Sequence, residues 1–79
     1  MDIQKGSIVR ALAGRDKGGL FVVLDTEGSY ACIADGNRRR IQHPKRKKLK
    51  HLAPTHTVCS GSTETNPQIR KAIREFNGG

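Results

Sequence analysis

Aromatic residues are scarce in this sequence. Among its 79 residues there is no tryptophan, one tyrosine and two phenylalanines, and only 34% of the residues are hydrophobic. A chain this short folds as one domain, and so little apolar material predicts a modest core without room for a large catalytic cleft. The shortage also excludes the paired aromatic platforms on which single-stranded nucleic acids stack, since Tyr30 and the two phenylalanines fit apolar strand or helix faces.

Acidic residues and long apolar runs are also few. Fifteen Lys and Arg residues outnumber seven Asp and Glu residues, so the formal net charge is +8, with a pI near 10.2. Such a chain favours a polyanionic partner, and nucleic acid is the first candidate. An anionic membrane would require a basic amphipathic helix, a lipid attachment site or an apolar span of about 20 residues. None is evident, and the start MDIQKGS lacks the apolar run of a signal peptide, so we expect a cytoplasmic protein without membrane contact.

Potential metal ligands and nucleophiles are too few for a catalytic or metal centre. In a cytoplasmic protein, Cys32 and Cys59 are expected to remain thiols. His56 and Cys59 form one close pair, whereas a structural zinc site needs four ligands, commonly in two such pairs. The pair has no evident acid to orient a general base, and GRDKGG lacks the spacing of a Walker nucleotide loop. We therefore expect no metal, no cofactor and no enzymatic activity.

A β-type run near the N-terminus ends in a glycine loop, residues 13–19, in which glycines flank three charges of alternating sign. Gly14 and Gly18 can adopt positive φ and let the backbone approach a partner closely, while Arg15 and Lys17 place cations at the tip. Such a loop suits a phosphate backbone. From these residues alone, the alternative is an ordinary hairpin turn with solvated charges.

Short apolar runs separated by turn formers predict an antiparallel sheet. The expected strands cover residues 6–12, 20–24, 30–34 and 38–41. Asp35-Gly36 is a frequent hairpin signal and predicts the turn before the last of them. The first strand is substantially apolar on both faces, as in a barrel wall, and the second forms the centre of the core. Spacing alone does not distinguish an open sheet from a closed barrel.

After Pro44 the chain continues as a basic segment that two leucines attach to the sheet, followed by a linker. Leu49 and Leu52 are three residues apart, which predicts a turn of 3₁₀ or α geometry or a short irregular strand that pins the basic segment to the sheet. Residues 53–65 are rich in Pro, Thr, Ser and Gly, and we expect a linker there.

A short helix is predicted over residues 66–77, with Asn66 as N-cap and Pro67 at the first helical position. Its apolar face consists of Ile69, Ala72, Ile73 and Phe76. Because a helix of about 15 Å is marginal alone in water, this face needs a surface to cover. It packs on the same domain, or it docks onto a partner or a second copy.

The basic segment, residues 38–50, is the main candidate site. Eight of its thirteen residues are Lys or Arg and none is acidic. Such a run is often a solvated tail, but here Ile41, Leu49 and Leu52 are interleaved with the charges, so folding can fix the cations on a surface. Cations that meet phosphates release counterions, and arginines add planar, bidentate contacts. The expected binding residues are Arg38, Arg39 and Arg40 with Gly14, Arg15, Lys17 and Gly18 for specific contacts, and Lys45, Arg46, Lys47, Lys48 and Lys50 for backbone neutralisation.

The first strand and the glycine loop together resemble the KOW motif of several large-subunit ribosomal proteins and transcription elongation factors. The matching positions are Gly6, Val9, Leu12, Gly14, Arg15, Asp16, Lys17 and Gly18. The segments FVVLDTEGSYACIADGNRRRI and KRKKLKHL resemble the eukaryotic-type ribosomal protein fourteen of the large subunit and small bacterial KOW proteins related to it. The likeness covers about the first two thirds of the chain and implies a small SH3-like barrel that binds ribosomal RNA. One departure is Phe21, where many KOW loops have another glycine.

The sequence therefore predicts a mainly β protein, with a small SH3-like antiparallel barrel over residues 1–52, a linker and a short C-terminal helix. We expect a monomeric, noncatalytic RNA-binding module that is cytoplasmic and ribosome-associated, with ribosomal proteins as further candidate partners. No helix-turn-helix, zinc-finger or basic-zipper pattern for the DNA major groove is evident. The alternative is an SH3-like protein-interaction module in translation or transcription.

Overall fold

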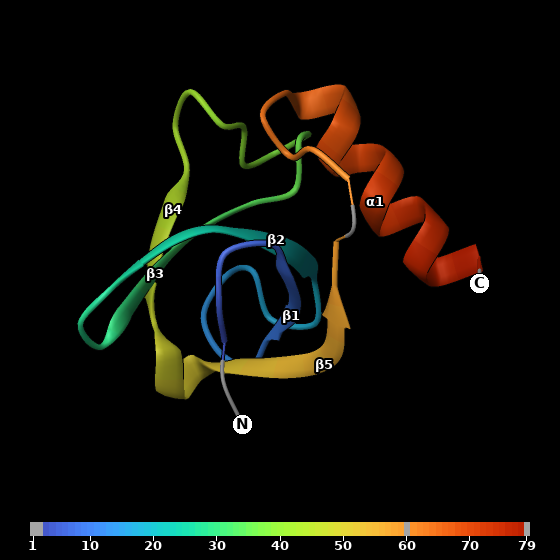
Figure 1. The fold of residues 1–79 in the computed structure, drawn as a ribbon. Helices are drawn as coiled ribbons and strands as arrows, with labels where there is room; N and C mark the ends of the chain where they lie inside the picture. The colour runs from blue at the N-terminus through green and yellow to red at the C-terminus, as the bar shows by residue number, and fades with distance from the viewer. Residues whose placement is uncertain (1–2, 60, 79) are drawn as a thin grey trace.

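The chain forms an antiparallel β structure that is followed by one helix (Figure 1). The computed structural model describes residues 3–59 and 61–78. Its elements are β1 (Ser7–Ala11), β2 (Leu20–Glu27), β3 (Tyr30–Ala34), β4 (Lys45–Lys48), the 3₁₀ turn η1 (Leu49–His51), β5 (Leu52–Val58) and α1 (Asn66–Gly78). The strands expected over 6–12, 20–24 and 30–34 and the terminal helix are confirmed. Of the alternatives left open at the end of the basic segment, the structure has the 3₁₀ turn.

The sheet closes into a small SH3-like barrel because of one short connection. The strand order is β4-β3-β2-β1-β5, so β4 and β5 are the two edges of the sheet. Only the three residues of η1 join them, and such a connection reaches about 14 Å at most. In a flat sheet these two strands would lie about 19 Å apart. The sheet must therefore curl until its edges approach each other, as Figure 1 shows.

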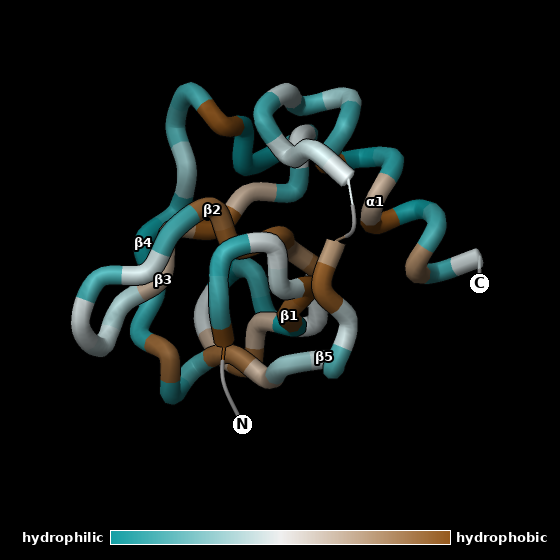
Figure 2. The backbone as a smooth tube through the Cα atoms, viewed as in Figure 1, coloured by the Kyte–Doolittle hydropathy of each residue, from teal (hydrophilic) through white to brown (hydrophobic). Residues whose placement is uncertain are grey.

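Both faces of β1, apart from Arg10, and of residues 20–24 of β2 are buried or half-buried. Successive side chains of a strand point to opposite faces, so Ile8 and Val9 enter different apolar clusters, as do Val22 and Val23. The cluster in the barrel comprises Val9, Ala11, Phe21, Val23, Ala31, Ile33 and Leu52. The second comprises Ile8, Val22, Ala34 and Ile69 of α1. Figure 2 shows the hydrophobic segments gathered around β1 and β2. The helix therefore packs on its own domain.

The strand expected over residues 38–41 is wrong. These residues form a loop in which the Arg39 carbonyl accepts hydrogen bonds from the N–H groups of Asp35 and Gly36, at 2.8 and 3.1 Å. Asp35 Oδ1 also accepts from the N–H groups of Asn37 and Arg39. Residues 36–39 are bends instead of a two-residue hairpin turn, their polar groups are satisfied within a compact loop, and the next strand begins only at Lys45.

The lysine-rich segment supplies the fourth strand instead. β4 begins directly after Pro44, pairs only with β3 and so lies at an edge of the sheet. A proline just before an edge strand removes no ladder bond. Charged side chains on such an edge oppose pairing with another sheet. The positive charge of this segment is therefore compatible with a strand as well as with a tail.

The linker expected over residues 53–65 is wrong for its first part. Residues 53–58 belong to β5, which pairs with β1, and residue 60 lies outside the described part of the chain. Pro54 is tolerated because β5 is an edge strand. The strand contains an irregularity at His56, whose φ is +67°, while the Thr55 hydroxyl donates to the carbonyl of Ile8 at 2.7 Å. A sequence poor in apolar residues therefore forms a strand through its pairing with β1.

A capping box opens the helix. Thr65 Oγ1 accepts from the Gln68 N–H at 3.3 Å, and Gln68 Oε1 accepts from the Thr65 N–H at 3.1 Å. The prediction of Asn66 as N-cap is wrong, because this side chain reaches to the loop between β3 and β4. Its Oδ1 accepts from the Ile41 N–H at 2.8 Å, and its Nδ2 donates to Gln42 Oε1 at 2.9 Å. Asn66 therefore joins the start of α1 to that loop.

Two valines provide a matched test of this packing. Val22 is fully buried in the second cluster, whereas Val58 is 46% exposed at the end of β5. We expect Val22→Ala to lower the free energy of unfolding by about 1–3 kcal/mol through cavity formation. Val58→Ala should lower it by less than about 0.5 kcal/mol. Urea unfolding followed by circular dichroism measures both, and equal losses would contradict the burial of both faces of β2.

Candidate nucleic-acid interface

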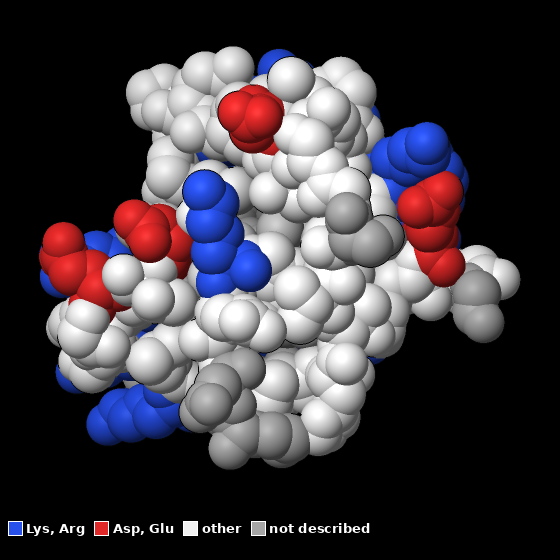
Figure 3. Space-filling view, viewed as in Figure 1, with Lys and Arg blue, Asp and Glu red and all other residues white. Residues whose placement is uncertain are grey.

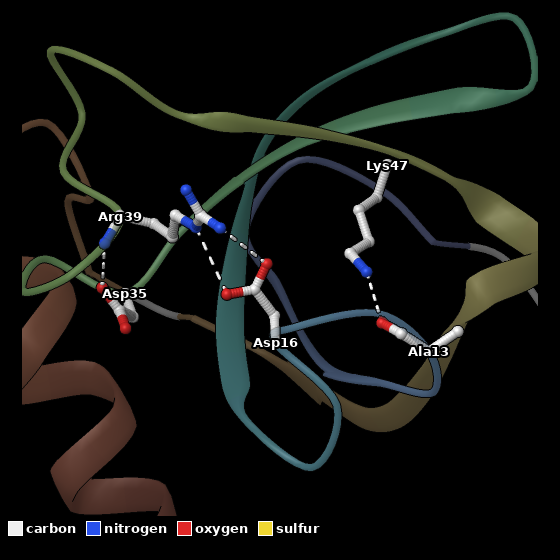
Figure 4. A network of polar contacts seen from close by, with 5 residues as sticks. All are labelled: Ala13, Asp16, Asp35, Arg39 and Lys47. Atoms are coloured by element: carbon white, nitrogen blue, oxygen red, sulfur yellow. Dashed lines mark hydrogen bonds and ion pairs between the residues drawn. The ribbon is translucent and has the colours of Figure 1, made fainter.

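Two basic loops meet at an ion pair. One is the glycine loop, and the other, residues 35–44, is called the arginine loop here. The Nε and Nη2 atoms of Arg39 donate to Oδ1 and Oδ2 of Asp16 at 3.2 and 3.1 Å (Figure 4). The Asp16 side chain is 4% exposed and that of Arg39 is 29% exposed. This bidentate, partly buried pair holds the two loops together. Arg39, predicted to contact RNA, has a structural partner inside the protein.

The glycine loop is stabilised by its own backbone. Its N–H donors at Lys17, Gly18 and Gly19 bond to the carbonyls of Gly14, Ala11 and Asp16, at 3.2, 2.8 and 2.9 Å. Gly14 and Gly18 have φ values of +80° and +87°, which confirms the expected positive φ. Because these three N–H groups are already bonded, they are not free to cradle a phosphate. Contacts with an anion would therefore come from the exposed side chains of Arg15 and Lys17.

The Lys47 side chain is buried at one end of the barrel. It is 9% exposed, and its Nζ donates to the carbonyl of Ala13 in the glycine loop (Figure 4). A Cβ at Gly14 would lie 2.9 Å from this nitrogen, so a glycine there leaves room for the amine. Alternation along β4 turns this side chain inward, so Lys47, predicted to neutralise an RNA backbone, is not among the exposed cations.

Arg46 is exposed and lies on the neighbouring hairpin. Its guanidinium carbon is 4.2 Å from the centroid of the Tyr30 ring. Its Nη2 is 3.7 Å from Glu27 Oε1, with both side chains mostly in solvent. An exposed ion pair of this kind contributes little to stability. Arg46 is thus oriented by the hairpin but remains accessible.

The other expected cations fall into two groups. Arg15, Lys17, Arg38 and Arg40 are exposed and are the immediate neighbours of Asp16 and Arg39 in the sequence. They therefore lie on two joined loops, and we call these four residues the loop surface.

The second group lies beside the β2–β3 hairpin. Lys48 and Lys50 are exposed at the end of β4 and in η1, where the Leu49 N–H donates to the carbonyl of Ser29 at 2.8 Å. Lys45, at the start of β4, is half-buried. In the view of Figure 3, acidic side chains also lie over this hairpin, and much of the face is uncharged. We therefore place the stronger candidate site on the loop surface.

Sequence reasoning missed a third set of cations. Arg10 of β1 and Arg70 and Arg74 of α1 line one groove between the helix and the barrel. The spacing of Arg70 and Arg74 by four residues placed them on one helix face. Nothing in the sequence, however, indicated that Arg10 would lie opposite that face, because this depends on how α1 packs.

The described residues contain no group of three or more His, Cys, Asp or Glu side chains that could bind a metal ion. Cys32 and Cys59 are both free thiols. Burial raises the pKa of the Cys59 thiol, which keeps it protonated and a weak nucleophile near neutral pH. Among the residues that the structure describes, no helix is long and apolar enough to span a bilayer.

Comparisons with protein-family models and with curated proteins find no match for this chain.

Arg38, Arg39 and Arg40 are consecutive, so substitutions at these positions separate the loss of the ion pair from the loss of one positive charge. Arg39→Ala should lower the free energy of unfolding by about 1–2 kcal/mol, because it leaves the buried Asp16 carboxylate without its partner. Arg38→Ala and Arg40→Ala remove the same charge from exposed positions and should each change stability by less than about 0.5 kcal/mol. Thermal and urea unfolding of the three variants provide the comparison. Similar stabilities for all three would show that the ion pair does not hold the loops together.

Proposed function

We propose that this protein is a noncatalytic RNA-binding module of the KOW type that binds structured RNA, with ribosomal RNA as the expected class. The observation that carries the proposal is the Asp16–Arg39 pair, which joins two loops and leaves Arg15, Lys17, Arg38 and Arg40 exposed on them. In this proposal the protein acts in the cytoplasm in association with the ribosome. The likeness of its glycine loop to the KOW motif supports the same function.

Phosphate contacts account for most of the expected affinity. The net charge of +8 attracts a polyanion at long range, and each contact with a phosphate releases counterions. The loop surface holds three arginines, which bind phosphate oxygens in bidentate geometry. Because these cations lie on loops that the ion pair holds, less conformational entropy is lost on binding than in a flexible basic tail. The surface is suited to recognising RNA by shape and backbone.

The alternative, a protein-interaction module, rested on two grounds: SH3-like barrels also bind proteins, and the helix offers an apolar face that could dock. In the structure this face covers the barrel, since Ile69 is fully buried with Ile8 and Val22, and Ile73 and Phe76 pack against the same cluster. Internal packing therefore accounts for the helix face, and only the general ability of SH3-like barrels to bind proteins still supports the alternative. Protein binding remains as an outcome of the experiment below.

The proposal predicts a salt-dependent loss of RNA binding in Arg38→Ala/Arg40→Ala. If each arginine meets one phosphate, the slope of log affinity against log salt should become shallower by about 1.4–1.8. The measurement is fluorescence anisotropy with a fragment of bacterial large-subunit ribosomal RNA over a range of salt concentrations. Folding should be retained, because both side chains are exposed.

The matched control is Lys5→Ala/Lys71→Ala, which removes the same charge from exposed positions outside the loop surface. This variant should retain the parent's slope. Equal slopes for the two double variants would place the site elsewhere. If the parent binds neither this RNA nor duplex RNA, or binds with little response to salt, the proposed function is wrong and protein partners become the better explanation.

A further inference from the structure

The groove between α1 and the barrel is large enough for a small ligand and is predominantly basic. Its volume is about 510 Å³, and its charged side chains are Arg10, Arg70, Arg74 and Asp35. Ligand sites commonly have volumes of about 300–1,000 Å³. Three positive charges and one negative charge make an anionic group the favoured occupant.

Two of the arginines are held in place by backbone carbonyls. Arg10 Nη1 donates to the carbonyl of Gly18 at 2.8 Å, and Arg70 Nη1 donates to that of Gly36 at 2.6 Å. A guanidinium has five N–H donors, so each retains donors for a ligand. Within residues 3–59 and 61–78, none of the three groove arginines forms an ion pair. No carboxylate therefore neutralises these three charges, and those of Arg10 and Arg70 are also oriented by the carbonyls.

The other residues that line the groove are suited to binding a nucleobase. Leu20 and Ile73 contribute apolar surface, and Asn37 and Asn77 contribute amides that donate and accept hydrogen bonds. A flat ring can lie on the apolar surface or stack on a guanidinium while its edge meets an amide. A phosphate joined to a planar, hydrogen-bonding ring combines the groups that this lining would recognise.

We propose that the groove binds one nucleotide of an RNA strand, with its phosphate against the arginines and its base over Leu20 and Ile73. This inference rests on the proposed function. Gly18 and Asn37 line the groove and belong to the glycine and arginine loops, which also carry the loop surface. An RNA strand bound along those loops therefore reaches the groove without leaving the protein. The helix then takes part in RNA binding as well as in stability.

The test compares two substitutions on α1 that remove one charge each. Arg74→Gln changes a groove residue, whereas Lys71→Gln changes an exposed residue outside the groove. Neither side chain has a hydrogen bond or ion pair within the described residues, so both variants should fold, which amide spectra will check. We expect Arg74→Gln to weaken binding of the ribosomal RNA fragment about three- to tenfold, as loss of one charge-assisted contact implies. Lys71→Gln should bind like the parent.

Adenosine 5′-monophosphate and inorganic phosphate are the small probes. In the parent, the nucleotide should shift the amide signals of Gly18, Asn37 and Ile73, and Arg74→Gln should reduce these shifts. Inorganic phosphate should leave the signal of Ile73 largely unchanged. Shifts at Ile73 that are equal for the two probes would overturn the placement of the base.

Failure of this inference is distinguishable from failure of the proposed function. If the parent binds RNA and Arg74→Gln binds as tightly as Lys71→Gln, the groove assignment is wrong while RNA binding stands. If adenosine 5′-monophosphate occupies the groove but the parent binds no RNA, both the RNA subsite and the proposed function are wrong, and the groove is a site for a free nucleotide.

Discussion

The structure depends on the burial of β1 and β2 from both sides. Ile8 and Val22 point to one face of the sheet, while Val9 and Val23 point to the other. Neither face can be left in water without losing the hydrophobic stabilisation that a small domain needs. The barrel encloses one face, and α1 covers the other. The position of the helix, and so of every residue on its polar side, follows from this requirement.

Covering the outer face also arranges the loops around α1. Asn66 at the start of the helix bonds to Ile41 and Gln42 of the arginine loop, and Arg70 bonds to the carbonyl of Gly36. Gly36 has a φ of +76°, and a Cβ there would overlap the Asn66 carbonyl oxygen, so only glycine permits this close approach. The helix, the arginine loop and the glycine loop therefore form one connected end of the molecule.

The cations divide between structural and surface roles. Lys47 and Arg39 have oxygen partners inside the protein, from Ala13 and Asp16, whereas the loop-surface residues remain exposed. The internal contacts restrict the two loops that carry the exposed charges. Since a basic surface gains affinity when its cations are preorganised, the internal and external cations serve the same proposed function. Their separation also explains why a charge count overestimates the number of cations available to a ligand.

The sequence by itself determined the first three strands, the terminal helix and the basic character of the chain, because local apolar periodicity and composition carry these properties. It did not determine that residues 45–48 and 52–58 are strands, since both are edges that depend on pairing with distant partners and contain charge or proline instead of an apolar pattern. Only the tertiary structure decided which cations are exposed. The same eight-cation segment contains Arg39, paired with Asp16, and Arg40, which is exposed, because contacts between residues far apart in the chain assign different environments to neighbouring residues of the same type.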